Sequence, residues 1–182
     1  MNARRNYPID IEEAAVYVGT YGKYNDGSLF GKWLKLSDYS NVQEFYAACR
    51  ELHKDEADPE FMFQDYENIP EGLISECGIS EQVFEVLQTL TEMESSEREP
   101  FMIWCNNDHY DLGKEDIDDL VNRFQDDYVG MYKDEEAFAY ELIEERDDIR
   151  DFAKQFFDYE AYANDLFCSD YWYEDGHVFY KN

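Results

Sequence analysis

Acidic side chains outnumber basic ones by 44 to 15 in this chain of 182 residues, which gives a formal net charge of −29. Self-repulsion on this scale destabilises a compact shape, although it favours solubility. The chain is nevertheless 18% aromatic, with 16 Tyr and 13 Phe, whereas disordered acidic chains are poor in aromatic residues. We therefore expect a folded protein whose elongated shape moves the charges apart.

The charge also restricts the partners. Duplex DNA carries one negative charge per roughly 1.7 Å of axis, so the net charge of −29 equals that of about 15 base pairs. We expect no binding to nucleic acid or to an anionic membrane, and attraction to proteins built to hold polyanions. A generally acidic surface, salt adaptation and cation buffering are alternative explanations of the composition.

Cysteine spacing and hydropathy indicate the compartment. The four cysteines contain no C-x-x-C pair, which favours reduced structural thiols over a disulfide framework. No apolar run approaches the roughly 20 residues that span a bilayer. We expect a cytoplasmic protein without a membrane segment.

The chain carries little that is typical of catalysis or metal binding. His53, His109 and His177 are isolated from one another, and no phosphate-binding, dinucleotide or nucleophile-elbow motif is present. The nearest approach to a calcium loop, Asn106–Tyr110, fails at its fifth and sixth positions. We expect no enzyme, no cofactor and no metal; an acidic hydrolase using one or two carboxylates is a less favoured alternative.

Periodicity predicts an α+β fold. In the first domain, 13–68, strands are expected at 14–20 and 29–35 on either side of a turn, and at 60–66. A helix with a capping box at Ser40 and Gln43 is expected between the second and third strands.

Two further domains are expected. In the middle domain, 69–126, a helix capped by Ser80 runs to about Met93 and is closed by SSEREP. FMIWC is then a strand or extended core segment, and a helix spans 117–124. The C-terminal domain, 127–182, has helical stripes at 137–143 and 149–157 and a hairpin around Glu174-Asp-Gly176.

Charge is concentrated between Lys114 and Asp151. Fifteen acidic and five basic residues leave ten net negative charges in these 38 residues. A solvated helix face normally alternates charge signs to gain i,i+4 pairs. The unpaired acids form either a solvated acidic face or a surface whose carboxylates stand in for phosphates, and their spacing alone does not separate the two. The candidate residues are Asp118, Asp119, Asp126, Asp127, Glu141, Glu144, Glu145, Asp147, Asp148 and Asp151.

Two stretches resemble a known family. Residues 17–33, YVGTYGKYNDGSLFGKW, resemble the opening of the ArdA antirestriction proteins, which show Tyr, then Tyr-Asn-x-Gly, then Gly-x-Trp. Residues 157–166, FDYEAYANDL, resemble the antirestriction motif of that family, with Asn164 where many members have Arg. The motif residues are Asp158, Tyr159, Glu160, Ala161, Tyr162, Asp165 and Leu166.

This resemblance implies three small α+β domains in a curved, elongated arrangement and a homodimer formed through the C-terminal domain. It also implies a DNA mimic, carried by mobile genetic elements, that occupies the DNA-binding groove of type I restriction-modification enzymes at their methyltransferase core. The charge would then replace that of a nucleotide backbone. An acidic module that sequesters another basic DNA-binding protein is the alternative.

The motif itself predicts a helix that begins near Asp158. Tyr159, Tyr162 and Leu166 then share one side, with Asp158, Glu160 and Asp165 off it. The apolar side is expected to pack the C-terminal domain or its dimer seam, and plain core packing is the alternative.

Overall fold

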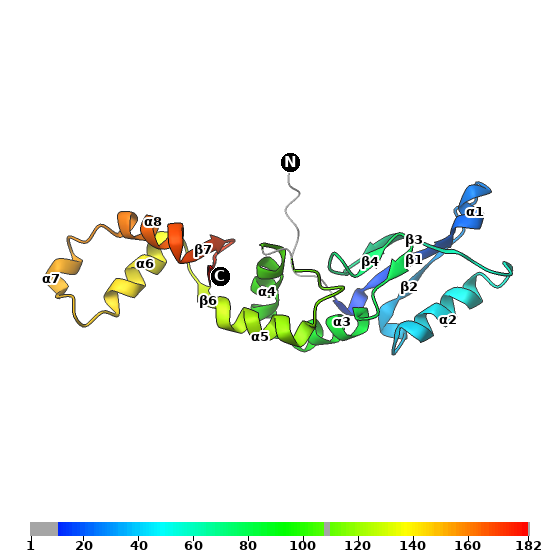
Figure 1. Ribbon diagram of the computed structural model, residues 1–182, viewed down its shortest axis with the longest axis horizontal. Coiled ribbons are helices and arrows are strands. Elements are labelled where there is room, and N and C mark those ends of the chain that lie inside the picture. Colours follow the sequence, from blue (N-terminus) through cyan, green and yellow to red (C-terminus); the bar gives the residue numbers. More distant parts are fainter. Residues whose placement is uncertain (1–10, 108–109, 182) are drawn as a thin grey trace. The chain divides into compact units, whose positions relative to one another are not determined.

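The computed structural model describes residues 11–107 and 110–181 (Figure 1). Its contacts divide the chain into two compact units, with the division between Leu120 and Val121. Helices and small antiparallel sheets occur in both units, so the expected α+β class is confirmed. The finer division into three domains stays a prediction.

The elements are as follows. The first unit contains η1 (Ile11–Glu13), β1 (Ala15–Thr20), α1 (Tyr21–Asn25), β2 (Lys32–Lys35), η2 (Leu36–Asp38), α2 (Val42–Leu52), β3 (Phe61–Glu67), β4 (Ile74–Ser75), β5 (Gly78–Ile79), α3 (Val83–Glu92) and α4 (Ser95–Asn107). Helix α5 (Ile117–Asp127) crosses the division. The second unit continues with β6 (Tyr128–Met131), α6 (Glu135–Glu144), α7 (Asp151–Lys154), α8 (Tyr159–Ser169), β7 (Tyr171–Glu174) and β8 (His177–Tyr180).

The first sheet has the order β2-β1-β3, with both pairings antiparallel. Its central strand β1 is buried because Val16 and Val18 lie in the core, and α2 adds the fully buried Phe45 and Cys49. The three strands expected at 14–20, 29–35 and 60–66 are confirmed, as is the helix between the second and third.

Glycine is needed where the chain enters β2. A Cβ atom on Gly31 would lie 2.6 Å from Tyr17 Cε1 and 2.6 Å from the Val18 carbonyl oxygen. The Tyr17 hydroxyl also donates to the Leu29 carbonyl at 3.1 Å. The segment before β2 therefore lies directly on β1, and no side chain fits between them.

Two local expectations near the first sheet are wrong. The turn expected at YGKYNDG begins as the short helix α1, because the Thr20 hydroxyl accepts from Lys23 N at 3.3 Å and caps it. The capping box of α2 lies one residue later than expected. Asn41 Oδ1 accepts from Glu44 N at 3.0 Å, and the Glu44 carboxylate accepts from Ser40 N at 2.8 Å.

The segments SSEREP and FMIWC belong to one helix, α4. The expectations that SSEREP ends a helix and that FMIWC is a strand or extended segment are therefore wrong. Five consecutive residues, Phe101–Cys105, are buried there, and an apolar run buried on all sides has no period that distinguishes helix from strand. Pro100 lies inside the helix and removes one backbone donor. The exposed Ser96, four residues earlier, holds the carbonyl that loses this bond.

The second unit is built on the antiparallel sheet β6-β8-β7. Helices α6 and α8 pack against it through a core of Phe138, Ala139, Ala163, Leu166 and Val178. The expected hairpin is confirmed: Asp175 and Gly176 have φ of 48° and 94°, as a two-residue type I′ turn requires.

The helical stripe expected at 149–157 is wrong. Only Asp151–Lys154 is helical, as α7, within the wide connection from α6 to α8 that Figure 1 shows. Phe152 and Phe156 are 73% and 74% exposed rather than buried. Within the described residues, this short segment therefore does not bury its aromatic rings in a core.

Candidate partner-binding surface

Helix α5 carries the first predicted phosphate-mimicking carboxylates. Asp116 begins the helix, with Oδ1 accepting from Asp118 N at 3.0 Å and from Asp119 N at 3.1 Å. The side chains of Asp118, Asp119 and Asp126 are exposed. Asp127 is only 6% exposed, so its carboxylate does not lie at the surface.

Helix α6 carries the next group. Its N-cap is Asp134, whose side chain accepts from Ala137 N at 2.8 Å. This backbone hydrogen bond holds the pKa of Asp134 below its usual value. Glu141, Glu144 and Glu145 are exposed at the other end of the helix, where negative charge gains nothing from the helix dipole.

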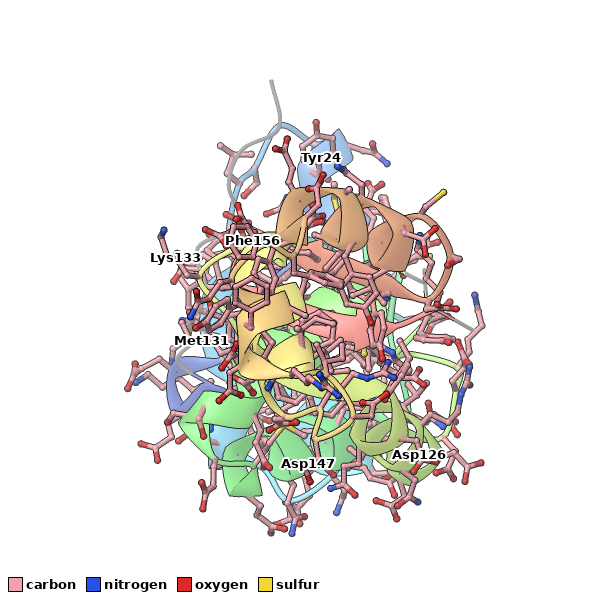
Figure 2. The ribbon with its side chains drawn as sticks, turned by 90° about the vertical axis from the view of Figure 1, so that its left-hand side faces the viewer. Tyr24, Asp126, Met131, Lys133, Asp147 and Phe156 are labelled. Carbon is pink, nitrogen blue, oxygen red and sulfur yellow. The ribbon has the colours of Figure 1, made fainter. Side chains whose placement is uncertain are left out.

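The connection after α6 holds Asp147, Asp148 and Asp151, all exposed. Asp148 differs from the other two because Arg146 binds it at two points. The hydrogen bond from Arg146 lowers the pKa of Asp148. In Figure 2, Asp126 and Asp147 lie along the lower edge of the second unit, and Phe156 lies above them.

Several basic side chains bind helix carbonyls instead of carboxylates. Lys154 Nζ donates to the Glu144 carbonyl at 2.7 Å, at the end of α6. Lys181 Nζ donates to the carbonyls of Phe167 and Cys168 in the last turn of α8. Such cations satisfy carbonyls that the helix leaves open. The exposed acids of the second unit therefore keep most of their charge uncompensated.

The same arrangement occurs in the first unit. Arg98 Nε donates to the Leu90 carbonyl at 2.7 Å, and its Nη2 donates to that of Met93 at 3.2 Å. Arg98 is the only Lys or Arg between Lys54 and Lys114, a stretch with 16 acidic residues. Sequence counting treats such a base as neutralising its neighbours, and its role at the end of α3 is visible only in the structure.

The antirestriction motif forms most of α8. Asp158 is the N-cap, with Oδ1 accepting from Ala161 N at 3.0 Å, so the helix begins where the motif predicts. Leu166 is buried and Tyr162 partly buried in the core of the unit. Glu160, Ala161 and Asp165 are exposed. The motif thus combines a helix cap, core packing and an exposed acidic side.

Tyr159 ties α8 to the preceding connection. Its hydroxyl donates to the Lys154 carbonyl at 3.0 Å, and its ring packs against Tyr140 and Phe157 with centroids 5.1 and 5.2 Å away. Partial burial raises the pKa of Tyr159, and the nearby Glu144 carboxylate adds to this. The tyrosine therefore stays neutral beside the acids.

An aromatic patch adjoins the acidic surface. Phe152 and Phe156 lie 5.1 Å apart between ring centroids, and both are exposed. The stretch from Ile149 to Phe157, IRDFAKQFF, has two bases and one acid, a net charge of +1. Its low charge is visible in the sequence, but the helical spacing of its apolar residues suggested burial instead.

Neither a metal centre nor a membrane span emerges within the described residues. No group of three His, Cys, Asp or Glu side chains in 11–107 and 110–181 is arranged to hold a metal ion. No helix in these ranges is long and apolar enough to cross a bilayer. His109 and part of the weak calcium-loop match lie outside the described residues.

Fold and surface together define an acidic α+β protein that displays carboxylates in excess of the bases available to pair with them. The family model described as Antirestriction protein (ArdA) matches residues 16–179. This match covers most of the chain, so the chain belongs to the ArdA family of antirestriction proteins, and the resemblance of its two motifs is confirmed. A search of curated proteins returned no match. Membership implies an antirestriction function and interaction with restriction-modification enzymes in general.

Proposed function

We propose that this protein inhibits type I restriction-modification enzymes in the cytoplasm by occupying the groove that binds DNA. The observation that carries the proposal is the set of exposed carboxylates in α5, in α6 and in the connection after it. With the buried Asp127 and the paired Asp148 set aside, these are Asp118, Asp119, Asp126, Glu141, Glu144, Glu145, Asp147 and Asp151.

The inhibition follows from electrostatics. A methyltransferase core positions DNA through Lys and Arg contacts to phosphate oxygens, and carboxylates accept the same charge-assisted hydrogen bonds. The protein offers no base edges, so inhibition is indifferent to the recognition sequence of the enzyme. Because the protein then occupies the groove, the enzyme cannot bind DNA there. Modification is therefore blocked together with restriction.

The proposal includes a homodimer formed through the second unit. Two chains that each carry −29 repel one another, so a shared surface needs low local charge. The exposed Phe152 and Phe156, within a stretch of net charge +1, support such a seam. Two chains together carry the charge of roughly 29 base pairs of duplex.

The experiment is plating of unmodified phage on a host that contains a type I system. Expression of the protein should raise plating efficiency toward that of a non-restricting host. Plating efficiency should rise less with a variant that carries Glu144→Gln, Glu145→Gln, Asp147→Asn and Asp151→Asn. The circular dichroism spectrum of this variant should match that of the parent. Unchanged restriction in the presence of the folded, expressed parent would refute the proposal.

A further inference from the structure

His53 is a fully buried polar residue in the first unit, outside the surface described above. It ends α2, and its ring contacts two other elements. Nε2 lies 3.3 Å from the Val18 carbonyl oxygen in β1, and Nδ1 lies 3.0 Å from Lys23 Nζ in α1. The side chain thus joins three elements of the fold.

These two contacts determine the state of the ring. A lysine ammonium has three donors and no acceptor, so Nδ1 accepts the hydrogen bond from Lys23. Nε2 then carries the ring proton and donates to the Val18 carbonyl. The imidazole is neutral in this arrangement, and no other tautomer satisfies both partners.

Charged groups face His53 from α1 and from the turn after α2. Lys23 Nζ lies 2.9 Å from Asp55 Oδ1 and 3.3 Å from Glu56 Oε1. Burial alone lowers the pKa of Lys23, but hydrogen bonds to Asp55 and Glu56 raise it by more, so the amine stays charged. Glu56 Oε1 is itself 3.9 Å from His53 Nδ1 and accepts from the Thr20 hydroxyl at 2.7 Å.

Lys23 and His53 together hold an exposed apolar segment. The Phe30 ring packs edge-on against His53, with centroids 5.7 Å apart, and lies 4.6 Å from Lys23 Nζ in a cation–π contact. Phe30 and its neighbour Leu29 are both exposed. The Phe30 ring therefore rests on the contact between Lys23 and His53, whereas the Leu29 carbonyl is held separately by the Tyr17 hydroxyl.

We propose that Lys23 and His53 form a proton-sensitive latch on the segment Tyr21–Gly31. A solvent proton bound at His53 Nδ1 removes the acceptor of Lys23 and places two cations side by side. Lys23 then keeps Asp55 as its partner and leaves the ring, while Glu56 is the acceptor within reach of the protonated Nδ1. The cation–π contact is lost, and the Phe30 ring is released from His53.

His177, which is buried in the second unit, lacks this property. His177 Nδ1 lies 3.0 Å from the Tyr128 hydroxyl, and a hydroxyl both donates and accepts. Protonation of His177 turns that hydroxyl around and preserves the bond. The second unit thus provides an internal reference for an effect of pH on buried histidine.

The experiment is amide hydrogen exchange of the full-length chain at about pH 7.5 and at about pH 5.5, the range in which histidine side chains change charge. After correction for intrinsic exchange, protection of residues 21–31 should fall by about tenfold or more over this range, because one linked proton changes an equilibrium by up to about tenfold per pH unit. Protection around Tyr128 and His177 should not change.

The matched control is His53→Gln, because a glutamine amide can accept from Lys23 and donate to the Val18 carbonyl but does not titrate. Protection of residues 21–31 should then be independent of pH. An equal fall in this variant and the parent would overturn the proposal. Nitrogen-15 chemical shifts of the His53 ring in the parent provide an independent test. The proposal is overturned if the ring stays neutral down to about pH 5.5. It is also overturned if the ring is protonated while the protection of residues 21–31 stays unchanged.

Discussion

Arg146 holds Asp148 at two points, with Nε 2.9 Å from Oδ1 and Nη2 2.6 Å from Oδ2. The pair is exposed and contributes no net charge to the acidic surface. Joint replacement by Arg146→Gln and Asp148→Asn should therefore leave inhibition within about twofold of the parent, as is usual for exposed ion pairs.

The contrasting variant combines Glu144→Gln and Glu145→Gln, which removes two exposed charges without releasing a base. Binding to a methyltransferase core should weaken, and the slope of log affinity against log salt should fall by about 2, one per lost contact. Titration at several salt concentrations measures this slope. An equal loss of binding in this variant and in the Arg146→Gln, Asp148→Asn variant would contradict the prediction, because pairing with Arg146 would then make no difference to partner binding.

The N-cap of α8 tests the structural role of the antirestriction motif. Asp158→Ala removes the acceptor of Ala161 N and should cost about 1 kcal/mol of unfolding free energy, whereas Asp158→Asn retains a capping oxygen and should cost less. Urea unfolding measures both. The cap would have no structural role if the alanine variant were as stable as the parent.

The approach of residues 29–31 to β1 predicts a strong effect at a small residue. Gly31→Ala places a methyl group 2.6 Å from a ring carbon of Tyr17 and should destabilise the chain by about 1–3 kcal/mol, as overpacking does. Gly78→Ala is the control, since its nearest neighbour lies 3.6 Å away. Thermal or urea unfolding of the two variants should differ clearly, and similar stabilities would contradict the packing described.

Salt should act oppositely on the two associations proposed for this protein. Partner binding rests on attraction and should weaken with salt, whereas self-association works against repulsion and should strengthen as the Debye length shrinks to about 3 Å at 1 M.

The proposed seam is tested by Phe152→Ser together with Phe156→Ser, which should abolish the dimer in sedimentation. Leu29→Ser, also at an exposed apolar position, should not. A dimer that survives the double serine variant would place the seam elsewhere.

Residue patterns predicted the elements in which β-branched composition, helical spacing or turn residues agree with the local structure. Strand β1, helix α2 and the hairpin of β7 and β8 all follow from such patterns. The pattern failed at α4, where five consecutive buried residues leave no period, and at α7, where helical spacing is not matched by a covering element. Periodicity reports which residues could share a face, and tertiary packing decides whether that face is covered.

Charge counting had a similar limit at the candidate surface. It identified the acid-rich stretch but could not separate the buried Asp127 or the paired Asp148 from their exposed neighbours. Nor could it show that Lys154 binds the end of α6 rather than a carboxylate. These distinctions depend on contacts between residues that are not adjacent on a single helix.

The most direct test is competition for a purified type I methyltransferase core between this protein and duplex DNA. Binding should be mutually exclusive: DNA displaces the labelled protein, duplexes with and without the recognition sequence both do so, and the protein's own affinity falls steeply with salt. A ternary complex in which the core holds the protein and DNA together would contradict it.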